Sequence, residues 1–301
     1  MTRPSSSPRP TRGRLLLLAA AAAATLAACS RDRDREPEAP APAARADPDA
    51  LVTPADAAAP SGFDEKTPWA EVRLILPGEL KAHPDLHARL YAEEVRKLRQ
   101  FAEGAQSDRT EAGADPNQPK FGNTVTFAAA AETGKLFSLK RTSFETGGPQ
   151  ANTLTSGVLW DKALKRQLGL ADLFRKGADL AALDQALCSA LNAAKRARVP
   201  DGPSITFDSK PFSCPRAAAT AFVLTPGDAP GKAAGLTFLI GPYQAGPYAE
   251  GGYEIAVPAT SFRSLLATAY AGEFGGRPAR TGDVTPAPTP VQAPAPAGPG
   301  R

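Results

Sequence analysis

The sequence predicts an α+β domain, an antiparallel sheet with two main helices packed on it, flanked by a disordered N-terminal tether and a proline-rich C-terminal tail. Segments with a helical period and segments with strand-like alternation occur in separate blocks, as in α+β folds. Residues 62–276 are long enough for one sizeable domain or two small ones packed together. Both ends are dominated by Ala and Pro with almost no aromatic residues, so they bury too little surface to fold.

The first 28 residues have the layout of an export signal. Four arginines and no acidic residue precede or border an apolar run over 15–26, which is too short for a spanning helix of about 20 residues. Residues 26–29, Leu-Ala-Ala-Cys, resemble the lipobox of bacterial lipoproteins, in which lipid is attached to the cysteine and the chain is cut in front of it. The resemblance implies that Cys29 carries the acyl chains, palmitate among them, and anchors the protein to a membrane. An ordinary signal peptide with an incidental Cys29 is the alternative.

The residues after Cys29 indicate in which membrane the protein is anchored and how its domain is tethered there. Ser30 stands where enterobacterial lipoproteins kept in the inner membrane have Asp, so the resemblance implies the outer membrane, with the protein facing the periplasm. Residues 29–61, which include the lipidated cysteine, then form the tether. Without the four signal arginines, 35 basic residues against 31 acidic ones become 31 against 31. A near-neutral chain without Lys/Arg stripes gives no footprint for nucleic acid.

The first half of the domain, residues 62–160, carries the clearest strand signals. An alternating run at 71–76 predicts a strand, and Pro84 begins a helix that we expect to end near Glu103, before a polar loop at 106–119. Three further strands, expected at 123–130, 136–144 and 153–160, are separated by turns at Thr133-Gly134 and Gly147-Gly148. Three successive strands of this kind indicate an antiparallel meander.

The second half, residues 161–276, is predicted to hold one long helix and several short strands. A leucine stripe predicts the helix over 179–198, and Pro200 ends it. The strands are expected at 205–207, 219–224, 236–240 and 253–257, and the tail occupies 277–301. Lipidation of Cys29 leaves Cys188 and Cys214. In an oxidising compartment these two are either joined or buried separately, and their even number favours the disulfide.

The element order and three segments resemble one envelope domain family. The segments are Phe144-Glu-Thr-Gly-Gly148, Trp160-Asp161 followed by Leu170-Ala-Asp-Leu-Phe174, and residues 242–251. The family is the extracellular domain shared by RsiV-like, lysozyme-sensing anti-sigma factors and by some peptidoglycan deacetylases. Residues 147–150 are Gly-Gly-Pro-Gln, where the family often has Gly-Gly-Ala-His, so any role of that histidine is absent. Because neither a deacetylase nor a sigma-binding domain is recognised, we expect a sensing or binding module without those outputs.

Two segments are candidate binding surfaces. Tyr243, Tyr248 and Tyr253 lie among glycines and prolines, and tyrosine is favoured at interfaces because it combines a large apolar face with a polar end. Gly147 and Gly148 form a turn whose backbone a ligand can approach closely. Inward-packed tyrosines in a strand-to-strand crossover and a plain hairpin turn are the respective alternatives.

The sequence predicts neither catalysis, nor a cofactor, nor a metal site. His83 and His87 are the only histidines, and Pro84 at the first helical position leaves His83 outside the helix, which spoils a paired metal site. Asp172 is expected to cap or turn the chain. We expect a non-catalytic binding domain, for a lysozyme-like muramidase or cell-wall glycan. A structural lipoprotein that holds another envelope protein is the main alternative, and a hydrolase with an unrecognised site is a further one.

Overall fold

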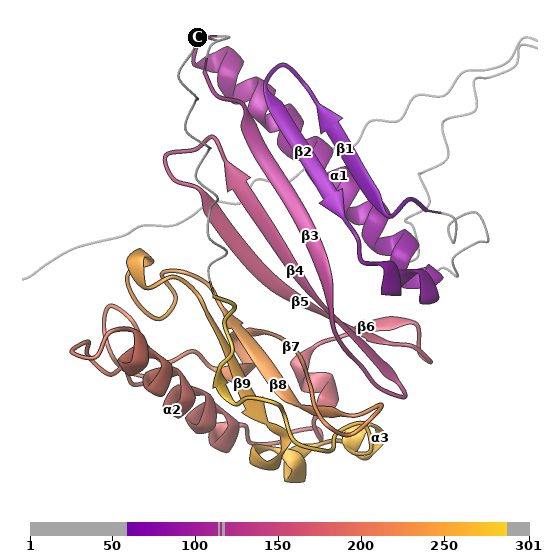
Figure 1. Cartoon of the computed structure of the whole chain (residues 1–301), viewed down its shortest axis with the longest axis vertical. Coiled ribbons are helices and arrows are strands. Elements are labelled where there is room, and N and C mark those ends of the chain that lie inside the picture. The colour runs from indigo at the N-terminus through magenta and orange to yellow at the C-terminus, as the bar shows by residue number, and fades with distance from the viewer. Residues whose placement is uncertain (1–58, 114, 116–117, 288–301) are drawn as a thin grey trace, which may run out of the picture. The chain divides into compact units, whose positions relative to one another are not determined.

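The computed structural model describes residues 59–113, 115 and 118–287 (Figure 1). The predicted α+β class is confirmed, because nearly all neighbouring strands are antiparallel and the helices are few. The strands form two sheets rather than one. The export signal, Cys29, nearly all of the tether and residues 288–301 lie outside the described residues. Within the described ranges, none of the helices has the length and apolar character needed to cross a bilayer.

The first sheet contains six strands in chain order: β1 (Gly62–Lys66), β2 (Ala70–Ile75), β3 (Phe121–Glu132), β4 (Leu136–Thr146), β5 (Asn152–Asp161) and β6 (Arg166–Leu168). The expected meander is present as β3, β4 and β5. In contrast, β2 and β3 pair in parallel. A parallel pair needs a long crossover, which the 28-residue helix α1 (Pro84–Glu111) provides.

Helix α1 packs on this first sheet and continues beyond its predicted end near Glu103. Its leucines share a buried core with apolar residues of β2 to β5, among them Leu74, Phe127, Leu139 and Trp160. The helix continues to Glu111 because Ala105 and Arg109 extend the buried stripe. The guanidinium of Arg109 lies 4.7 Å from the ring centroid of Phe121, a favourable cation–π distance. The polar sequence after residue 106 therefore begins as helix and not as loop.

The second sheet has four strands in the order β10 (Gly282–Asp283), β9 (Tyr253–Pro258), β8 (Ala233–Ile240) and β7 (Ala221–Pro226). Helix α2 (Ala181–Arg198) contacts β9 and β10, and a one-turn helix, α3 (Thr268–Ala271), follows β9. The buried core of this part joins α2 leucines to Phe238, Ile255 and Phe262. In the part of the chain that the structure describes, six 3-10 segments connect the elements, at Gly78–Ala82, Leu170–Leu173, Ala217–Ala219, Tyr248–Glu250, Ala259–Ser261 and Arg263–Leu265.

The two sheets share a close contact along β5 and β7. A Cβ atom on Gly157 would lie 1.7 Å from the carbonyl oxygen of Phe222, so only glycine allows the strands to approach so closely. The amide of Leu224 donates to the hydroxyl of Ser138 on β4 at 3.0 Å. Leu136 of β4, in the first sheet, belongs to the core of the second part. Strands of both predicted halves therefore contribute to one buried core. The predicted division after residue 160 stays a prediction.

Some short segments differ from the sequence prediction. Strands β1, β6 and β10 lie where no strand was expected, and β10 and residues 284–287 fall within the predicted tail. The run 205–207 forms no strand. The side-chain amide of Asn192 bonds to both backbone groups of Ile205, each at 2.8 Å, and occupies the groups that a strand partner would need. A disulfide joins Cys188 to Cys214, whose Cα atoms are 5.3 Å apart.

Candidate functional site

Tyr243 and Tyr248, which we call the tyrosine pair, lie exposed in the loop between β8 and β9. Tyr243 is 61% exposed and Tyr248 is 40% exposed. The two ring centroids are 5.6 Å apart, and the ring planes are tilted by 39°, within the range of favourable aromatic contacts. The pair therefore presents a joined aromatic surface to solvent.

The loop that carries the tyrosine pair has a defined backbone. The side-chain oxygen of Gln244 accepts a hydrogen bond from the amide of Gly241 at 2.9 Å. Tyr243 has a φ of 65° and lies in the left-handed region, which costs a residue other than glycine about 1–3 kcal/mol. Such conformations persist only where the surroundings determine them, and they concentrate at functional sites. The backbone of Tyr243 is therefore held in a costly conformation while its ring stays exposed to solvent.

Tyr248 joins the two segments that the sequence marked separately. Its hydroxyl donates to the backbone carbonyl of Ala151 at 2.8 Å, across 97 residues of chain. Ala151 lies in the turn between β4 and β5, three residues after Gly148. The tyrosine pair and the Gly-Gly turn are therefore neighbours, which local sequence patterns do not reveal.

Phe144 adds a further exposed ring at this end of the β4–β5 hairpin and was not among the predicted site residues. It is 47% exposed and pairs with Thr153, two residues from Ala151. Alternate residues of a strand point to one face, and Phe144 shares its face with Ser138, which contacts the second sheet. The sequence signal for it is a large apolar residue only three positions before Gly147, at the end of a strand that is about to turn.

Gly147 is required by packing, whatever else the turn does. Its φ is 95°, and a Cβ atom there would lie 2.7 Å from the Cα atom of Phe121. Gly147 and Gly148 line a hollow together with Arg109 and Phe121. The structure explains the first glycine by the close approach of β3, and a ligand contact at either glycine stays a prediction.

Tyr253 does not belong to the exposed surface. The prediction that it contacts a ligand is corrected here, because the residue is buried. Only 1% of the residue is exposed. Its hydroxyl donates to the carboxylate of Glu250 at 2.7 Å, and the guanidinium of Arg198 lies 3.9 Å from its ring centroid. Burial, followed by the hydrogen bond to Glu250, raises the pKa of Tyr253. This third tyrosine packs inward, as in the alternative interpretation of the loop.

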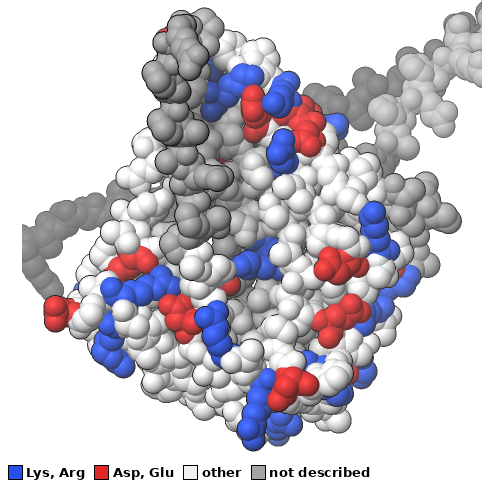
Figure 2. All heavy atoms as spheres, in the orientation of Figure 1, with Lys and Arg blue, Asp and Glu red and all other residues white. Residues whose placement is uncertain are grey.

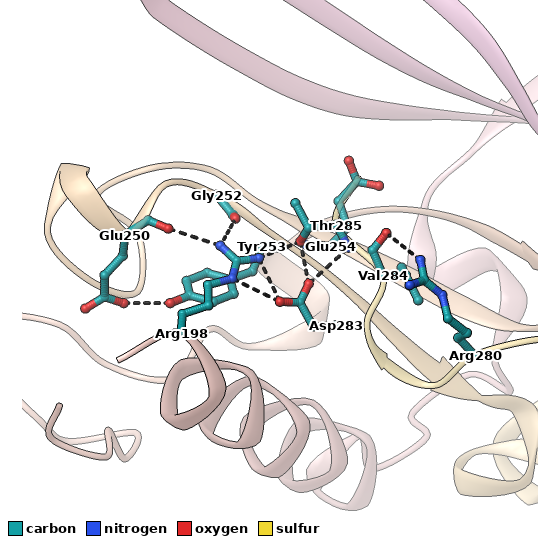
Figure 3. A network of polar contacts seen from close by, with 9 residues as sticks. All are labelled: Arg198, Glu250, Gly252, Tyr253, Glu254, Arg280, Asp283, Val284 and Thr285. Atoms are coloured by element: carbon teal, nitrogen blue, oxygen red, sulfur yellow. Dashed lines mark hydrogen bonds and ion pairs between the residues drawn. The ribbon is translucent and has the colours of Figure 1, made fainter. Parts of the chain in front are cut away.

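Arg198, Asp283 and Thr285 form a polar group that we call the arginine clasp (Figure 3). Arg198 makes two bonds to Asp283, one to the hydroxyl of Thr285 and one to each carbonyl of Glu250 and Gly252, at 2.7 to 3.0 Å. These bonds use all five guanidinium N–H groups. Burial acts to raise the pKa of Asp283, but hydrogen bonds from Thr285 and Arg198 hold it below its ordinary value. The clasp leaves no Arg198 donor for a ligand.

The two histidines have separate structural environments. His83 precedes α1, as predicted, and its ring centroid lies 4.3 Å from that of Phe137. His87 is buried in α1, with Nε2 3.1 Å from the carbonyl oxygen of Pro60. Over the residues that the structure describes, no three His, Cys, Asp or Glu side chains are grouped to hold a metal ion.

Asp161 and Asp172 bind the backbone. Asp172 accepts a hydrogen bond from the amide of Gly169 at 2.8 Å and closes a 3-10 turn, as the sequence predicts. Asp161 accepts from the amide of Ala163 at 2.9 Å and from the hydroxyl of Tyr270 at 2.8 Å. Burial, and then the bond to Asp161, raises the pKa of Tyr270 to about 12. Both carboxylates are accounted for by local structure.

Charges of both signs are mixed on the surface (Figure 2), and the loop of the tyrosine pair holds one carboxylate. Acidic and basic side chains are interspersed on the face shown in Figure 2, without a large area of one sign. Glu250, in the loop of the tyrosine pair, is bound by Lys195 at 2.6 Å, and both side chains are largely buried. Although burial opposes the effect, hydrogen bonds from Lys195 and Tyr253 hold the pKa of Glu250 below its ordinary value. The loop therefore keeps its one carboxylate neutralised.

Two solved structures are similar to this chain. A DUF3298-family protein from Pseudomonas aeruginosa is 17% identical, with a TM-score of 0.47, and the match covers 72% of this chain and 94% of that one. A member of the same family from Bacteroides fragilis is also 17% identical, with a TM-score of 0.45, and the match covers 70% of this chain and 94% of that one. No family model and no curated protein sequence matches the chain.

Proposed function

We propose that this chain is a cell-envelope lipoprotein, lipidated at Cys29, whose folded part is a non-catalytic binding module for cell-wall glycan. The observation that carries the proposal is the tyrosine pair, in which two aromatic rings stay exposed in a loop with a defined backbone. Rigid, exposed aromatic side chains supply contact area at a low cost in conformational entropy. A surface of this kind is suited to the apolar face of a sugar ring.

The polar surroundings favour a glycan over a charged protein. The proton of the Tyr248 hydroxyl is already donated to Ala151, so the ring face and the lone pairs of the hydroxyl oxygen are left for a ligand. Glu250 is paired with Lys195, and the loop offers no acidic surface for a basic muramidase. A muramidase that binds the same rings, or an envelope protein held by the domain, is an outcome that the binding test separates.

The binding test uses the full-length chain and insoluble peptidoglycan. We expect the chain to sediment with peptidoglycan, and the double variant Tyr243→Ala with Tyr248→Ala to remain in solution. Tyr253→Phe is the matched control, because it removes a buried hydroxyl and leaves the exposed rings in place. Equal sedimentation of all three proteins would contradict the proposal. Capture of a muramidase or of one envelope protein, without binding to peptidoglycan, would overturn the glycan assignment.

The anchoring test concerns Cys29. We expect cells that express the full-length chain to incorporate labelled palmitate into it and to retain it in the outer-membrane fraction. Cys29→Ser removes the thiol that receives the lipid, so the variant should lose the label and leave the membrane fraction. A Cys29→Ser protein that is labelled and retained like the parent would refute lipidation at this residue.

A further inference from the structure

A second hollow lies between the two sheets, away from the tyrosine pair. It has a volume of about 320 Å³ and is lined by β3, β4, β7, β8 and β9 together with residues 279, 280 and 284. Small-molecule sites in proteins are mostly apolar clefts of about 300–1,000 Å³ with a few placed polar groups. None of the lining residues belongs to the tyrosine pair, so this hollow is independent of the proposed function.

The walls of the hollow are small and apolar. Residues 128, 129 and 130 are three consecutive alanines, and Ala130 is the extra residue of a β-bulge in β3. Bulges change the direction of side chains and are frequent beside sites. Val223 and Leu224 of β7, both buried, also line the hollow. Alanine methyl groups leave space that larger side chains would fill, so the hollow has room for a short apolar body.

Unused hydrogen-bond donors remain around this apolar space. The hydroxyls of Thr225 and Thr237, both buried, lie 2.8 Å apart. One bond between them uses one of their two protons, which leaves the other proton for an acceptor. Lys140 is paired with Glu254 at 2.8 Å, and its ammonium group has further N–H donors.

Arg280 brings to the rim a positive charge that no described carboxylate compensates. Its one hydrogen bond among the described residues is to the carbonyl oxygen of Val284, at 3.5 Å, and no described carboxylate pairs with it. With Lys140 balanced by Glu254, the ionised groups lining the hollow therefore sum to one positive charge. An arginine fork is the group best matched to a carboxylate.

The arginine clasp fixes the wall that Arg280 borders. The amide of Val284 donates to the carbonyl of Glu254 at 2.8 Å, and the amide of Glu254 donates to the hydroxyl of Thr285 at 2.9 Å. Figure 3 shows Arg280 and Val284 beside this network. The clasp thus holds residues 283–285 against β9, and a pre-formed wall lowers the entropic cost of binding a ligand.

We propose that this hollow binds a small molecule with one carboxylate on a short apolar body. The apolar part lies against the alanines and Val223, and the carboxylate accepts hydrogen bonds from Arg280 and a threonine hydroxyl. Such a carboxylate is found at the end of a short acyl chain and at the C-terminus of a peptide with small side chains. Both sources share the chemistry that the hollow recognises.

The test is calorimetric titration of the full-length chain with octanoate and with N-acetyl-dialanine. We expect at least one of them to bind, which identifies the source, and octanol and N-acetyl-dialanine amide to bind about tenfold more weakly or worse. Arg280→Gln should weaken binding of the carboxylate about tenfold, since a hydrogen bond to a charged group is lost. Arg263→Gln is the matched control, because Arg263 is exposed and lies outside the hollow.

A second variant tests the apolar wall. Ala128→Leu places a larger side chain in the hollow and should abolish binding, and an unchanged circular dichroism spectrum will show that the fold is kept. The proposal is overturned if neither carboxylate binds at millimolar concentration. It is also overturned if binding survives both Arg280→Gln and Ala128→Leu. Peptidoglycan sedimentation should be unaffected by Arg280→Gln, so failure here is distinguishable from failure of the glycan proposal.

Discussion

The loop between β8 and β9 and the first residue of β9 together contain three tyrosines, which lie in two opposite environments. Tyr243 and Tyr248 are 61% and 40% exposed, whereas Tyr253, at the start of β9, is 1% exposed. The ring of Tyr253 lies under Arg198, and its hydroxyl is bonded to Glu250. The composition of the segment does not distinguish these roles. The contacts of each ring and hydroxyl do.

The largest difference is expected in stability. Tyr253→Ala should lower the free energy of unfolding by about 3–5 kcal/mol, the usual cost of deleting a buried aromatic side chain. Tyr243→Ala removes an exposed ring and should change it by no more than about 0.5 kcal/mol. Urea unfolding of the two variants beside the parent measures both values. Equal losses of unfolding free energy would contradict the assignment of Tyr253 to the core and of Tyr243 to the surface.

The next effect comes from the arginine clasp. Arg198→Met keeps an apolar side chain over Tyr253 but removes five hydrogen bonds, and we expect a loss of about 2 kcal/mol because Asp283 then lacks its charged partner. Hydrogen exchange of the Val284 amide, which pairs with β9, should become faster. Exchange in β4 should stay slow. Uniform acceleration in both places would show that the clasp acts on the whole fold and not on β10.

Acid should weaken the arginine clasp through Asp283. The pKa of Asp283 is lowered in the folded state from 3.8, so its stabilising effect is present above about pH 4 and is lost as the pH falls through the folded value. Asp283→Asn should be less stable than the parent at pH 7, and the difference should shrink towards pH 3. Unfolding curves at both values measure it. A difference independent of pH would exclude Asp283 as the titrating group.

The smallest effect is expected at the exposed end. Tyr248→Phe removes the hydrogen bond to Ala151 and should cost about 0.5 kcal/mol, at the low end for a neutral bond because the site is exposed. Peptidoglycan binding should weaken modestly, since the ring stays but is held less firmly. Sedimentation and urea unfolding together check this. A loss of binding as large as that of the Tyr243→Ala and Tyr248→Ala double variant would assign the recognition to the hydroxyl and not to the ring face.

The elements with a strong local period were predictable, and those formed by distant contacts were not. The leucine stripe of α2, the alternation of β2 and the strand-like composition of β4 gave nearly correct bounds. The strand β10 has two residues and no apolar pattern, and the clasp holds it. The run 205–207 has strand composition, but Asn192 binds its backbone. Local pattern does not contain either contact.

The candidate site divides in the same way. Glycines and prolines marked the loop, and the exposed tyrosines were among the predicted residues. The approach of Tyr248 to Ala151 spans 97 residues, and the burial of Tyr253 depends on Arg198 from another helix. Three alanines in β3 gave no sequence signal, because small residues reveal a hollow only when the opposite wall is known.

The central claim is that the exposed rings, and not the buried one, form the binding surface. The most direct measurement is calorimetric titration of a soluble peptidoglycan fragment into the full-length chain, its Tyr243→Ala and Tyr248→Ala double variant, and Tyr253→Phe. We expect the parent and Tyr253→Phe to bind with similar affinity and the double variant to bind at least tenfold more weakly, a loss of about 1.4 kcal/mol. Equal affinity of the double variant and the parent would contradict the account.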